Sequence, residues 1–388
     1  MAPPRTPPER AELTGNREFL LTPGPLTTSL AVKRAMLRDW GSRDRQFIDL
    51  NARVRARLTQ LAGGGDDFTC VPVQGSGTFA IEATLGTLVP RGGRLLVLVN
   101  GAYGERMMKI ARVTGRDAIA LTSAEDRTPD LGRLDRMLAE DAAIGHVAAV
   151  HCETTSGILN PIEAIARIVA RHERRLVIDA MSSFGALPLD AAALPCDAVV
   201  ASSNKCLEGV PGVGYAIVRR SVLDGCQGNA HSLALDLHDQ WRAMEANGQW
   251  RFTPPTHVLA AFDRALAEHE AEGSIAGRHR RYEANRRALV DGMRAQGFET
   301  LLPDPIQAPI IVTFRMPGDP AFDFEDFYDR LALRGYVIYP GKLTVAPSFR
   351  IGCIGHLAPE DILAAVGAVA EAVREMGVTD LAPLARSA

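Results

Sequence analysis

The sequence predicts an α/β protein, with a mostly parallel sheet in a large N-terminal domain and a smaller C-terminal α+β domain. In roughly the first two-thirds of the 388 residues, short apolar runs alternate with amphipathic helical patterns. Such alternation is typical of a parallel sheet whose two faces are covered by helices. After about residue 270 the order changes to a mixture of strand and helix patterns. A chain of this length can also form two separate hydrophobic cores.

Short apolar runs are the expected strands of the large domain. They are RLLVLV (94–99), HVAAVH (146–151), RRLVID (174–179) and AVVA (198–201). The stretches LGRLDRMLAED and PIEAIARIVARHE between them have helical spacing. Pro161 suits the first turn of the second helix, because the N–H that proline lacks has no helical partner there.

A long helical pattern over about 256–297 leads into the second domain. Beyond it, APIIVTFRM, YVIYPG and SFRIGC are expected strands, and FDFEDFYDRLALRG and APEDILAAVGAVAEAVREMG are expected helices. We therefore expect a large domain over 18–270 and a small domain over 271–388, with the N-terminal segment joining the small domain or the entrance of the site. Residues 1–17 are polar and rich in proline, which predicts a disordered tail and no secretory signal.

The composition excludes several classes of partner. A net charge of −3 and a pI near 6.3 give no reason to expect nucleic acid or a membrane surface. No run of 18 apolar residues occurs. The six cysteines are scattered, with no CxxC and no paired Cys/His spacing, which argues against a metal site or a disulfide framework. This usage favours a reducing, cytoplasmic location.

An acid and a lysine follow two of the expected strands. Asp179 ends RRLVID, and Lys205 lies 26 positions later (205 − 179) in SSNKCLEGVPG, after AVVA. Most lysines are solvated surface groups, and an acid alone at a strand end is as easily a cap or turn residue. The separation suits one connection and one further strand. Both side chains would then lie at the edge where open α/β sheets bind ligands.

A glycine-rich turn, Gly75 to Thr78 in VQGSGTFAIEATLG, precedes a helical pattern. Its backbone N–H groups can face an anion at the helix N-terminus, although such turns are common. It is neither a P-loop nor a GxGxxG fingerprint. A phosphate cradle, an acid and a lysine at one sheet edge are together what a pyridoxal 5′-phosphate site requires. The lysine forms a Schiff base with the aldehyde, the acid holds the pyridinium proton and the helix end takes the phosphate.

At these motifs the chain resembles the fold-type I, class V aminotransferases. The resembling segments extend from residue 19 to 355. They are FLLTPGPLTTS, VQGSGTFAIEATLG, LVNGAYGERM, VHCETTSGILNPI, VIDAMSSFG, SSNKCLEGVPG, QWRFTPPTHVL, VIYPGK and FRIGCIG. DAMSSFG with SSNKC, VIYPGK and FRIG are similar to the phosphonate branch rather than to alanine–glyoxylate or phosphoserine enzymes. The resemblance implies a mostly parallel sheet of the seven-stranded type in the large domain.

The resemblance also implies catalytic roles. Lys205 is the Schiff-base lysine and then the base that moves the proton, and desolvation beside a cation would lower its pKa. Asp179 pairs with the ring nitrogen. Tyr103 in NGAYGERM matches an aromatic residue that stacks on the ring, although a lone tyrosine is as easily a core residue.

Further residues would hold the phosphate or the ring hydroxyl. By the resemblance, Ser76, Gly77 and Thr78 take the phosphate. Thr155 or Ser156 in HCETTSG reaches the ring hydroxyl or the phosphate, and which of them does so stays open.

Two more contacts to the cofactor follow from the resemblance. Ser203 adds a hydroxyl near Lys205. A threonine of TPPT, Thr253 with Thr256 as the alternative, would reach the phosphate of a partner subunit. The implied assembly is a homodimer with shared active sites.

Arg350 in SFRIGCIG is the carboxylate clamp by resemblance, because its planar fork meets a carboxylate bidentately. Gly24 in FLLTPGPLTTS joins it as a substrate-binding residue. Additional candidates for the phosphonate, each expected to be structural rather than functional, are Arg43, Arg45, Arg251 and Lys342.

The function implied is transfer of the amino group of 2-aminoethylphosphonate to pyruvate, giving phosphonoacetaldehyde and L-alanine in phosphonate catabolism. The alternatives are a class V aminotransferase acting on alanine or serine with glyoxylate or pyruvate, and a non-catalytic protein that binds the cofactor. A scaffold would need none of Asp179, Lys205 and Arg350, which argues against the second alternative.

Overall fold

The computed structural model describes residues 7–342 and 346–383. A seven-stranded sheet forms its larger part, in the order β2-β10-β9-β8-β5-β3-β4. The strands are β2 (Phe68–Gln74), β3 (Arg94–Val99), β4 (Asp117–Thr122), β5 (Ile144–Val150), β8 (Arg175–Asp179), β9 (Ala198–Ser202) and β10 (Val213–Arg219). β10 runs antiparallel to both of its neighbours, whereas the other pairs are parallel. The predicted mostly parallel sheet is therefore confirmed.

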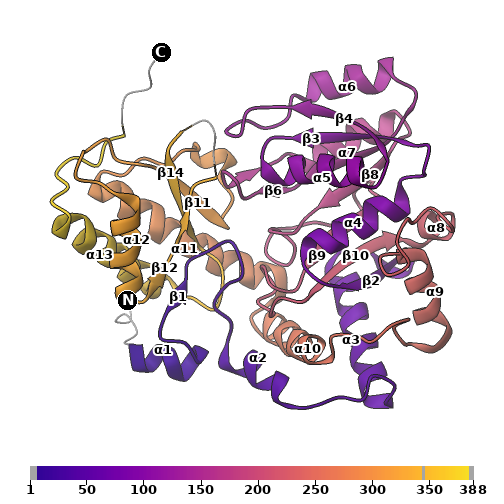
Figure 1. Cartoon of the computed structure of the whole chain (residues 1–388), viewed down its shortest axis with the longest axis horizontal. Coiled ribbons are helices and arrows are strands. Elements are labelled where there is room, and N and C mark those ends of the chain that lie inside the picture. The colour runs from indigo at the N-terminus through magenta and orange to yellow at the C-terminus, as the bar shows by residue number, and fades with distance from the viewer. Residues whose placement is uncertain (1–6, 343–345, 384–388) are drawn as a thin grey trace.

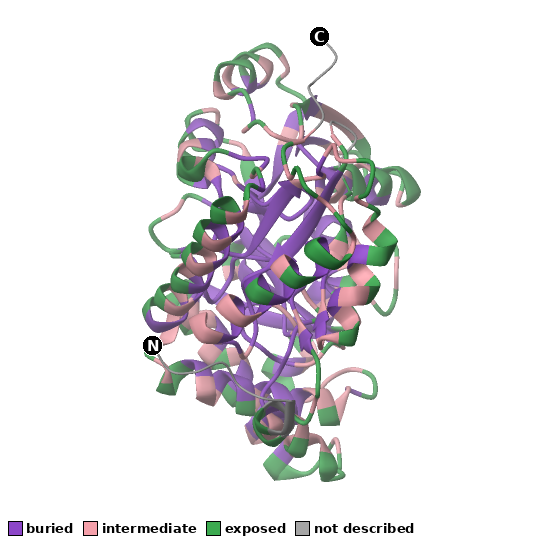
Figure 2. Ribbon diagram, turned by 90° about the vertical axis from the view of Figure 1, so that its left-hand side faces the viewer, coloured by how far each residue is buried: buried purple, intermediate pink, exposed green. Residues whose placement is uncertain are grey.

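Helices cover both faces of this sheet (Figures 1 and 2). The side chains on both sides of most of its strands are therefore buried, which fits the continuous apolar runs of the sequence. In β8, Ile178 belongs to the core on one face and Val177 to the core on the other. Helices α3 (Arg45–Leu61), α6 (Leu131–Glu140), α7 (Ile162–Arg171) and α10 (Thr256–Ala271) supply the first core. Helices α4 (Gly77–Leu88), α5 (Ala102–Val113) and α9 (Leu237–Asn247) supply the second.

The C-terminal part has its own core around a three-stranded antiparallel sheet, β11-β14-β13. Its strands are β11 (Ile311–Arg315), β13 (Tyr339–Pro340) and β14 (Ser348–Gly352), and its helices are α11 (Ser274–Gln296), α12 (Phe324–Leu333) and α13 (Pro359–Glu375). The N-terminal segment joins this part, because β1 (Phe19–Leu20) pairs in parallel with β12 (Tyr336–Val337). The boundary expected at 270/271 falls at the end of α10, and as a domain boundary it stays a prediction.

The helical pattern expected over about 256–297 is confirmed, and it consists of two helices, α10 and α11, because Gly273 takes a left-handed φ of +98° between them. One local expectation is corrected. Residues 7–14 of the expected disordered tail form α1 (Pro7–Thr14), and Lys33 Nζ donates to Asn16 Oδ1 at 2.9 Å just after it. Residues 1–6 of that tail lie outside the described residues.

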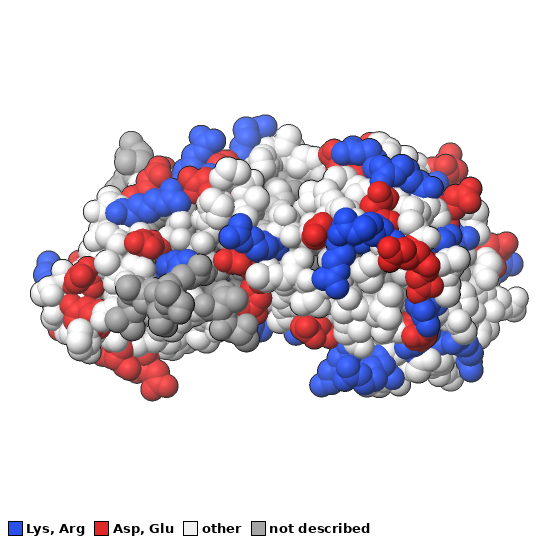
Figure 3. All heavy atoms as spheres, turned by 90° about the horizontal axis from the view of Figure 1, so that it is seen from above, with Lys and Arg blue, Asp and Glu red and all other residues white. Residues whose placement is uncertain are grey.

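The surface carries charges of both signs. On the face shown in Figure 3, basic and acidic side chains are interspersed. Among the described helices, none is long and apolar enough to cross a membrane.

Candidate active site

A cavity of about 210 Å³ lies at the carboxyl edge of the large sheet. Six of the predicted residues line it: Ser76, Gly77, Thr78, Tyr103, Asp179 and Lys205. They meet there because β2, β8 and β9 run in the same direction, so that the segments following each strand converge at one edge.

The N-terminus of α4 provides the anion-binding end of this cavity. Ser76 is the N-cap residue, and its side chain makes no capping hydrogen bond to the helix. The N–H groups at the start of a helix lack the usual intrahelical acceptors, although that of Phe79 donates to Ser76 O at 2.9 Å, and the helix dipole is positive here. This end of the cavity therefore suits a phosphate.

Asp179 closes β8 and is only 4% exposed. Its Oδ1 accepts a hydrogen bond from the backbone N–H of Met181 at 2.9 Å. Burial raises the pKa of Asp179 to about 6, and the nearby Glu153 adds to that effect, while Lys205 opposes it. A carboxylate in such a place is stabilised by a cationic N–H donor in the cavity.

Lys205 follows β9, the neighbour of β8 in the sheet, and lines the same cavity. Its Nζ donates to the carbonyl oxygens of Pro23 at 2.6 Å and Gly24 at 3.3 Å. Burial lowers the pKa of Lys205 to about 8, and the charge of Asp179 partly opposes this. At pH 7 the amine is therefore still mostly protonated, but its neutral fraction is far larger than that of a solvated lysine, whose pKa is about 10.4.

Gly24 is not among the residues that line the cavity, but it lies against Lys205, which is. Its φ is +102°, and a Cβ at this position would lie 2.6 Å from Lys205 Cδ and 2.8 Å from the oxygen of Asn204. Only glycine fits this close approach without displacing the loop that carries Lys205.

Two predicted hydroxyl groups are engaged elsewhere. Ser203 Oγ donates to the oxygen of Val210 at 2.6 Å, and the serine that lines the cavity is Ser202. Adjacent residues at a strand end point in opposite directions, and the contact expected of Ser203 with the cofactor stays a prediction. Thr155 Oγ1 donates to Glu153 Oε1 at 2.6 Å and accepts from the N–H of Ala102.

The hydroxyl of Ser156, unlike that of Thr155, has no hydrogen-bond partner among the residues that the structure describes, although it is buried. Neither residue is among those that line the cavity. Which of the two contacts the cofactor stays a prediction.

Arg350 lies in β14 and is 1% exposed. Its Nε donates to Pro340 O at 3.0 Å and its Nη1 donates to Thr154 O at 2.8 Å. The guanidinium thus rests against the loop that contains Thr155 and Ser156, outside the cavity lining. Burial, and after it the charges of Arg350 and Arg106, lower the pKa of Lys342, so Lys342 lies near these two arginines.

The other basic candidates have structural partners or lie on the surface. Arg251 Nη2 donates to Leu233 O at 2.6 Å and its Nη1 lies 3.3 Å from Asp239. Arg45 pairs with Asp49 on the exposed face of α3, and Arg43 is exposed.

Thr253 is exposed and lies beside a second, largely apolar groove. Gly75, Phe79 and Phe252 also line that groove, and both phenylalanines are 50% exposed. Thr256 begins α10, where its Oγ1 lies 3.4 Å from His257 Nδ1. In the single chain neither threonine lines the cavity.

Sequence reasoning missed Arg106, which lines the cavity. Its guanidinium lies 4.9 Å from the centroid of the Tyr103 ring, and its Nη1 donates to Thr78 Oγ1 at 3.1 Å. The available signal was spacing, since Arg106 follows Tyr103 by three positions in a helix and therefore shares its face.

Glu153 was missed as well. It is fully buried, and its carboxylate accepts hydrogen bonds from the N–H groups of Tyr103 at 3.1 Å and Thr155 at 3.0 Å. An acidic residue inside the apolar and hydroxyl-rich run VHCETTSG was the signal. Glu153 thereby fixes the start of α5, which carries Tyr103 and Arg106.

Glu153→Ala is expected to lower the free energy of unfolding by about 1–3 kcal/mol, because it leaves the buried N–H groups of Tyr103 and Thr155 without an acceptor. Urea unfolding measures this change. Glu140→Ala, at an exposed position of α6, is the matched control and should change stability by less than about 0.5 kcal/mol. Equal effects of the two substitutions would contradict the role given to Glu153.

Comparison with known proteins defines the class. The family model described as Aminotransferase class-V matches residues 30–351, and the chain belongs to this family. Among its relatives, the 2-aminoethylphosphonate–pyruvate transaminase of Pseudomonas putida is 55% identical over 366 residues, which cover 94% of this chain and 100% of the relative. The 2-aminoethylphosphonate–pyruvate transaminase 2 of Burkholderia lata is 56% identical over 93% of this chain and 96% of its own length.

Solved structures share the fold. Pyridoxamine–pyruvate aminotransferase from Mesorhizobium loti superimposes with a TM-score of 0.85 at 24% identity, over 92% of each chain. Aspartate aminotransferase from Thermus thermophilus superimposes with a TM-score of 0.83 at 23% identity, over 92% of this chain and 100% of the other. The fold predicted from the sequence is thereby confirmed.

Proposed function

We propose that this chain transfers the amino group of 2-aminoethylphosphonate to pyruvate, with pyridoxal 5′-phosphate as cofactor, releasing phosphonoacetaldehyde and L-alanine. The observation that carries the proposal is the cavity shared by Lys205, Asp179 and the N-terminus of α4. The substrate is supported by the names of relatives that are 54–56% identical over nearly the whole chain.

The residues of the cavity fit this cofactor. The N–H groups at Ser76, Gly77 and Thr78 suit its phosphate, and the buried carboxylate of Asp179 suits the protonated ring nitrogen. Ser202 Oγ is buried without a partner within the described part of the chain and lines the same cavity, so it offers a further polar contact. When bound, the cofactor supplies a ring that accepts electrons from the substrate carbon.

Lys205 moves the proton in this proposal. With a pKa of about 8, its neutral amine is available to take the proton from the amine-bearing carbon of the substrate. The ammonium group that results is held by the carbonyl oxygens of Pro23 and Gly24. These contacts also keep the side chain in place while it returns the proton.

Arg350 binds the carboxylate of the keto acid. Its Nε and Nη1 are fixed by two backbone carbonyls, which leaves the Nη2 N–H groups for a ligand among the contacts that the structure describes. Arg350 also serves the phosphonate in the other half of the reaction, with Arg106 and Lys342 as the neighbouring cations. The anionic groups of both substrates thus meet one cationic side of the site.

The active form is a homodimer in this proposal. The groove beside Thr253 exposes Phe79 and Phe252 and borders Gly75, next to the phosphate-binding turn. A second copy covering this groove would bury both rings and bring a threonine to the phosphate. All six cysteines are buried and unpaired, which supports a reducing cytoplasm as the location.

The loading of the cofactor is expected to depend on pH through Lys205. Because burial lowers its pKa to about 8, the cofactor-free protein should capture the aldehyde faster as the pH rises to about 8 and level off above it. Stopped-flow absorbance measures the rate, with a solution analogue of the lysine side chain as the control. A midpoint near about 10, as for a solvated lysine, would contradict the burial argument.

Product analysis tests the function. Purified enzyme is incubated with 2-aminoethylphosphonate and pyruvate, and alanine and phosphonoacetaldehyde are quantified by NMR. We expect both products in equal amounts, and a lower rate with alanine or serine as donor and glyoxylate as acceptor. Turnover with alanine or serine but not with 2-aminoethylphosphonate would contradict the proposed substrate, while the membership in the aminotransferase family would still hold.

A further inference from the structure

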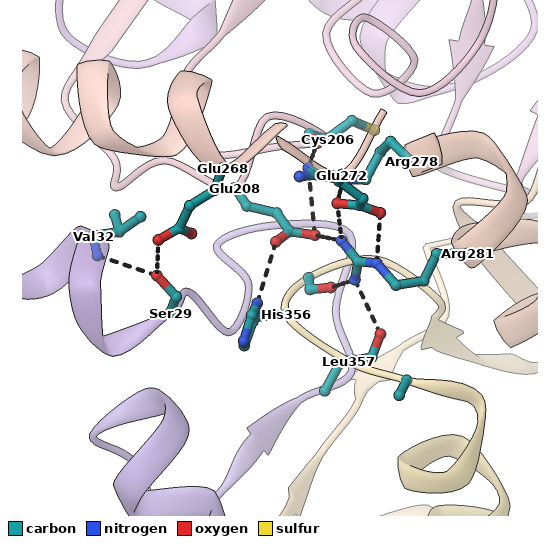
Figure 4. Close-up of polar contacts among 12 residues, drawn as sticks. Ser29, Val32, Cys206, Glu208, Glu268, Glu272, Arg278, Arg281, His356 and Leu357 are labelled. Carbon is teal, nitrogen blue, oxygen red and sulfur yellow. Dashed lines mark hydrogen bonds and ion pairs between the residues drawn. The ribbon is translucent and has the colours of Figure 1, made fainter. Parts of the chain in front are cut away.

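A buried cluster of charged side chains lies against the loop that follows Lys205 (Figure 4). It consists of Glu208, Glu272, Arg278, Arg281 and Tyr282, here called the Glu208 network. Three of its members are almost inaccessible, with exposed fractions of 4% for Glu208, 1% for Arg278 and 0% for Tyr282. The arginines and the tyrosine come from α11, whereas Glu208 belongs to the Lys205 loop.

One arm of the network holds the Lys205 loop. The N–H of Glu208 donates to Lys205 O at 2.8 Å, and Arg278 Nη1 donates to Cys206 O. Glu208 Oε1 accepts from Tyr282 Oη at 2.7 Å and from Arg281 Nη2 at 2.8 Å. Cys206 and Glu208, which follow Lys205 in the chain, are thus fixed to α11.

The other arm holds the segment that follows β14. Arg281 Nη1 donates to Gly355 O at 2.5 Å and to Leu357 O at 3.0 Å. The N–H of Gly355 donates to Tyr282 Oη at 3.2 Å. This segment begins directly after β14, the strand that carries Arg350.

The backbone at Glu208 is strained. Its φ of +56° lies in the left-handed region, which is unfavourable for a residue with a side chain. Strain of this kind persists only where the surrounding contacts determine the conformation, and it gathers at functional sites. The contacts that determine it here are those of the Glu208 network.

The charges of the network balance but give little net stability. Glu208 and Glu272 face Arg278 and Arg281, with Glu272 Oε2 2.8 Å from Arg278 Nε and Glu272 Oε1 2.8 Å from Arg281 Nε. The two arginines more than offset burial, so the pKa of Glu208 is lowered and the carboxylate stays charged. A buried ion cluster is a weak stabiliser compared with apolar packing, and its best-supported use is to fix one geometry.

We infer that Glu208 is a positioning residue that fixes Lys205 relative to Arg350 through the Glu208 network. Lys205 moves the proton and Arg350 orients the keto acid, so their separation sets how the substrate carbon meets the amine. A misplacement of about 1 Å can cost about 100-fold in rate. The inference rests on the roles given to Lys205 and Arg350 in the proposed function.

The first test compares Glu208→Gln with Glu268→Gln. The glutamine keeps the shape and removes the charge that holds Arg281. We expect kcat/KM for pyruvate to fall about 10- to 100-fold and the visible circular dichroism of the bound cofactor to change. Glu268 is a matched control, because it accepts from Ser29 Oγ and Arg264 Nε, each at 3.0 Å, and among the described residues no hydrogen bond or ion pair joins it to the Lys205 loop. Unchanged kinetics and dichroism in Glu208→Gln would overturn the inference.

The second test separates positioning from a general loss of packing. Arg281→Lys keeps the positive charge but cannot bridge Glu208, Gly355 and Leu357 at once. Combined with Arg350→Lys in a double-mutant cycle, it should show effects on kcat/KM for pyruvate that are not additive. Additive effects would overturn the inference. If Glu208→Gln yields little folded protein, the cycle with Arg281→Lys is the deciding test.

Assays of the wild-type protein show whether a negative result contradicts the inference or the proposed function. If the wild type uses another amine in place of 2-aminoethylphosphonate, the substrate proposal fails, and the same cycle is measured with that amine and its keto acid. If the wild type transaminates as proposed and the cycle is additive, only the inference fails.

Discussion

Replacing Lys205 with alanine is expected to lower kcat for transamination by at least about 1,000-fold, because the variant has neither the amine that binds the cofactor nor the base that moves the proton. No other lysine lines the cavity among the described residues, so no other lysine amine there can replace that of Lys205. Single-turnover kinetics with each substrate measure the loss.

The control is Lys109→Ala, on an exposed position of α5. It should leave kcat within about two-fold, since a solvated surface lysine contributes little. Borohydride reduction followed by peptide mass spectrometry should place the cofactor on the peptide that contains Lys205. Covalent cofactor on another lysine, or a Lys205→Ala variant with wild-type kcat, would refute the assignment.

Asp179→Asn is expected to lower kcat by about 100-fold or more, comparable with the loss of a preorganised charge elsewhere in enzymes. Asparagine still accepts the N–H of Met181 through its carbonyl oxygen, so the turn after β8 survives. What it loses is the negative charge that keeps a proton on the ring nitrogen of the cofactor. Steady-state kinetics at saturating cofactor measure the effect.

The pH dependence of cofactor affinity gives this prediction a second readout. Burial raises the pKa of Asp179 to about 6 in the protein alone, so the carboxyl group is increasingly protonated, and neutral, as the pH falls below 6. The wild type should therefore bind the cofactor more weakly below about pH 6, and Asp179→Asn should lack this loss. Asp66→Asn, at an exposed position, is the control. Identical pH profiles for wild type and Asp179→Asn would contradict the role.

The sequence predicted the parallel strands best, because a strand buried on both faces is a continuous apolar run. RLLVLV is β3, and the runs at 146–151, 174–179 and 198–201 overlap β5, β8 and β9 within two residues at each end. β2 escaped notice because it contains Pro72, which suits its place at the edge of the sheet, opposite Tyr215. β10 begins inside the glycine-rich loop after Lys205 and runs antiparallel, against the expected alternation.

Site residues could be predicted from the sequence where they lie at or just after the end of a strand, or at the start of a helix. Asp179, Lys205 and Ser76 to Thr78 line one cavity for that reason. The choice between Ser202 and Ser203 depends on which side chain faces inward, and a strand end does not fix this from sequence. The role predicted for Thr253 requires a second chain and stays a prediction.

The Glu208 network had no sequence signal of its own. Arg278 and Arg281 fall in RHRRYEANRR, which has the composition of a solvated helix face. In the folded chain Arg278 is buried and Arg281 is partly buried, because α11 packs against the Lys205 loop and the segment after β14. Long-range ion pairs of this kind are decided by tertiary structure.

The most direct test of the proposed function is a single-turnover reaction of the yellow, cofactor-loaded enzyme with one amine at a time and no keto acid. We expect 2-aminoethylphosphonate to remove the yellow colour and release one equivalent of phosphonoacetaldehyde, and pyruvate added afterwards to restore the colour and release alanine. Loss of colour with alanine or serine but not with 2-aminoethylphosphonate would contradict the proposal.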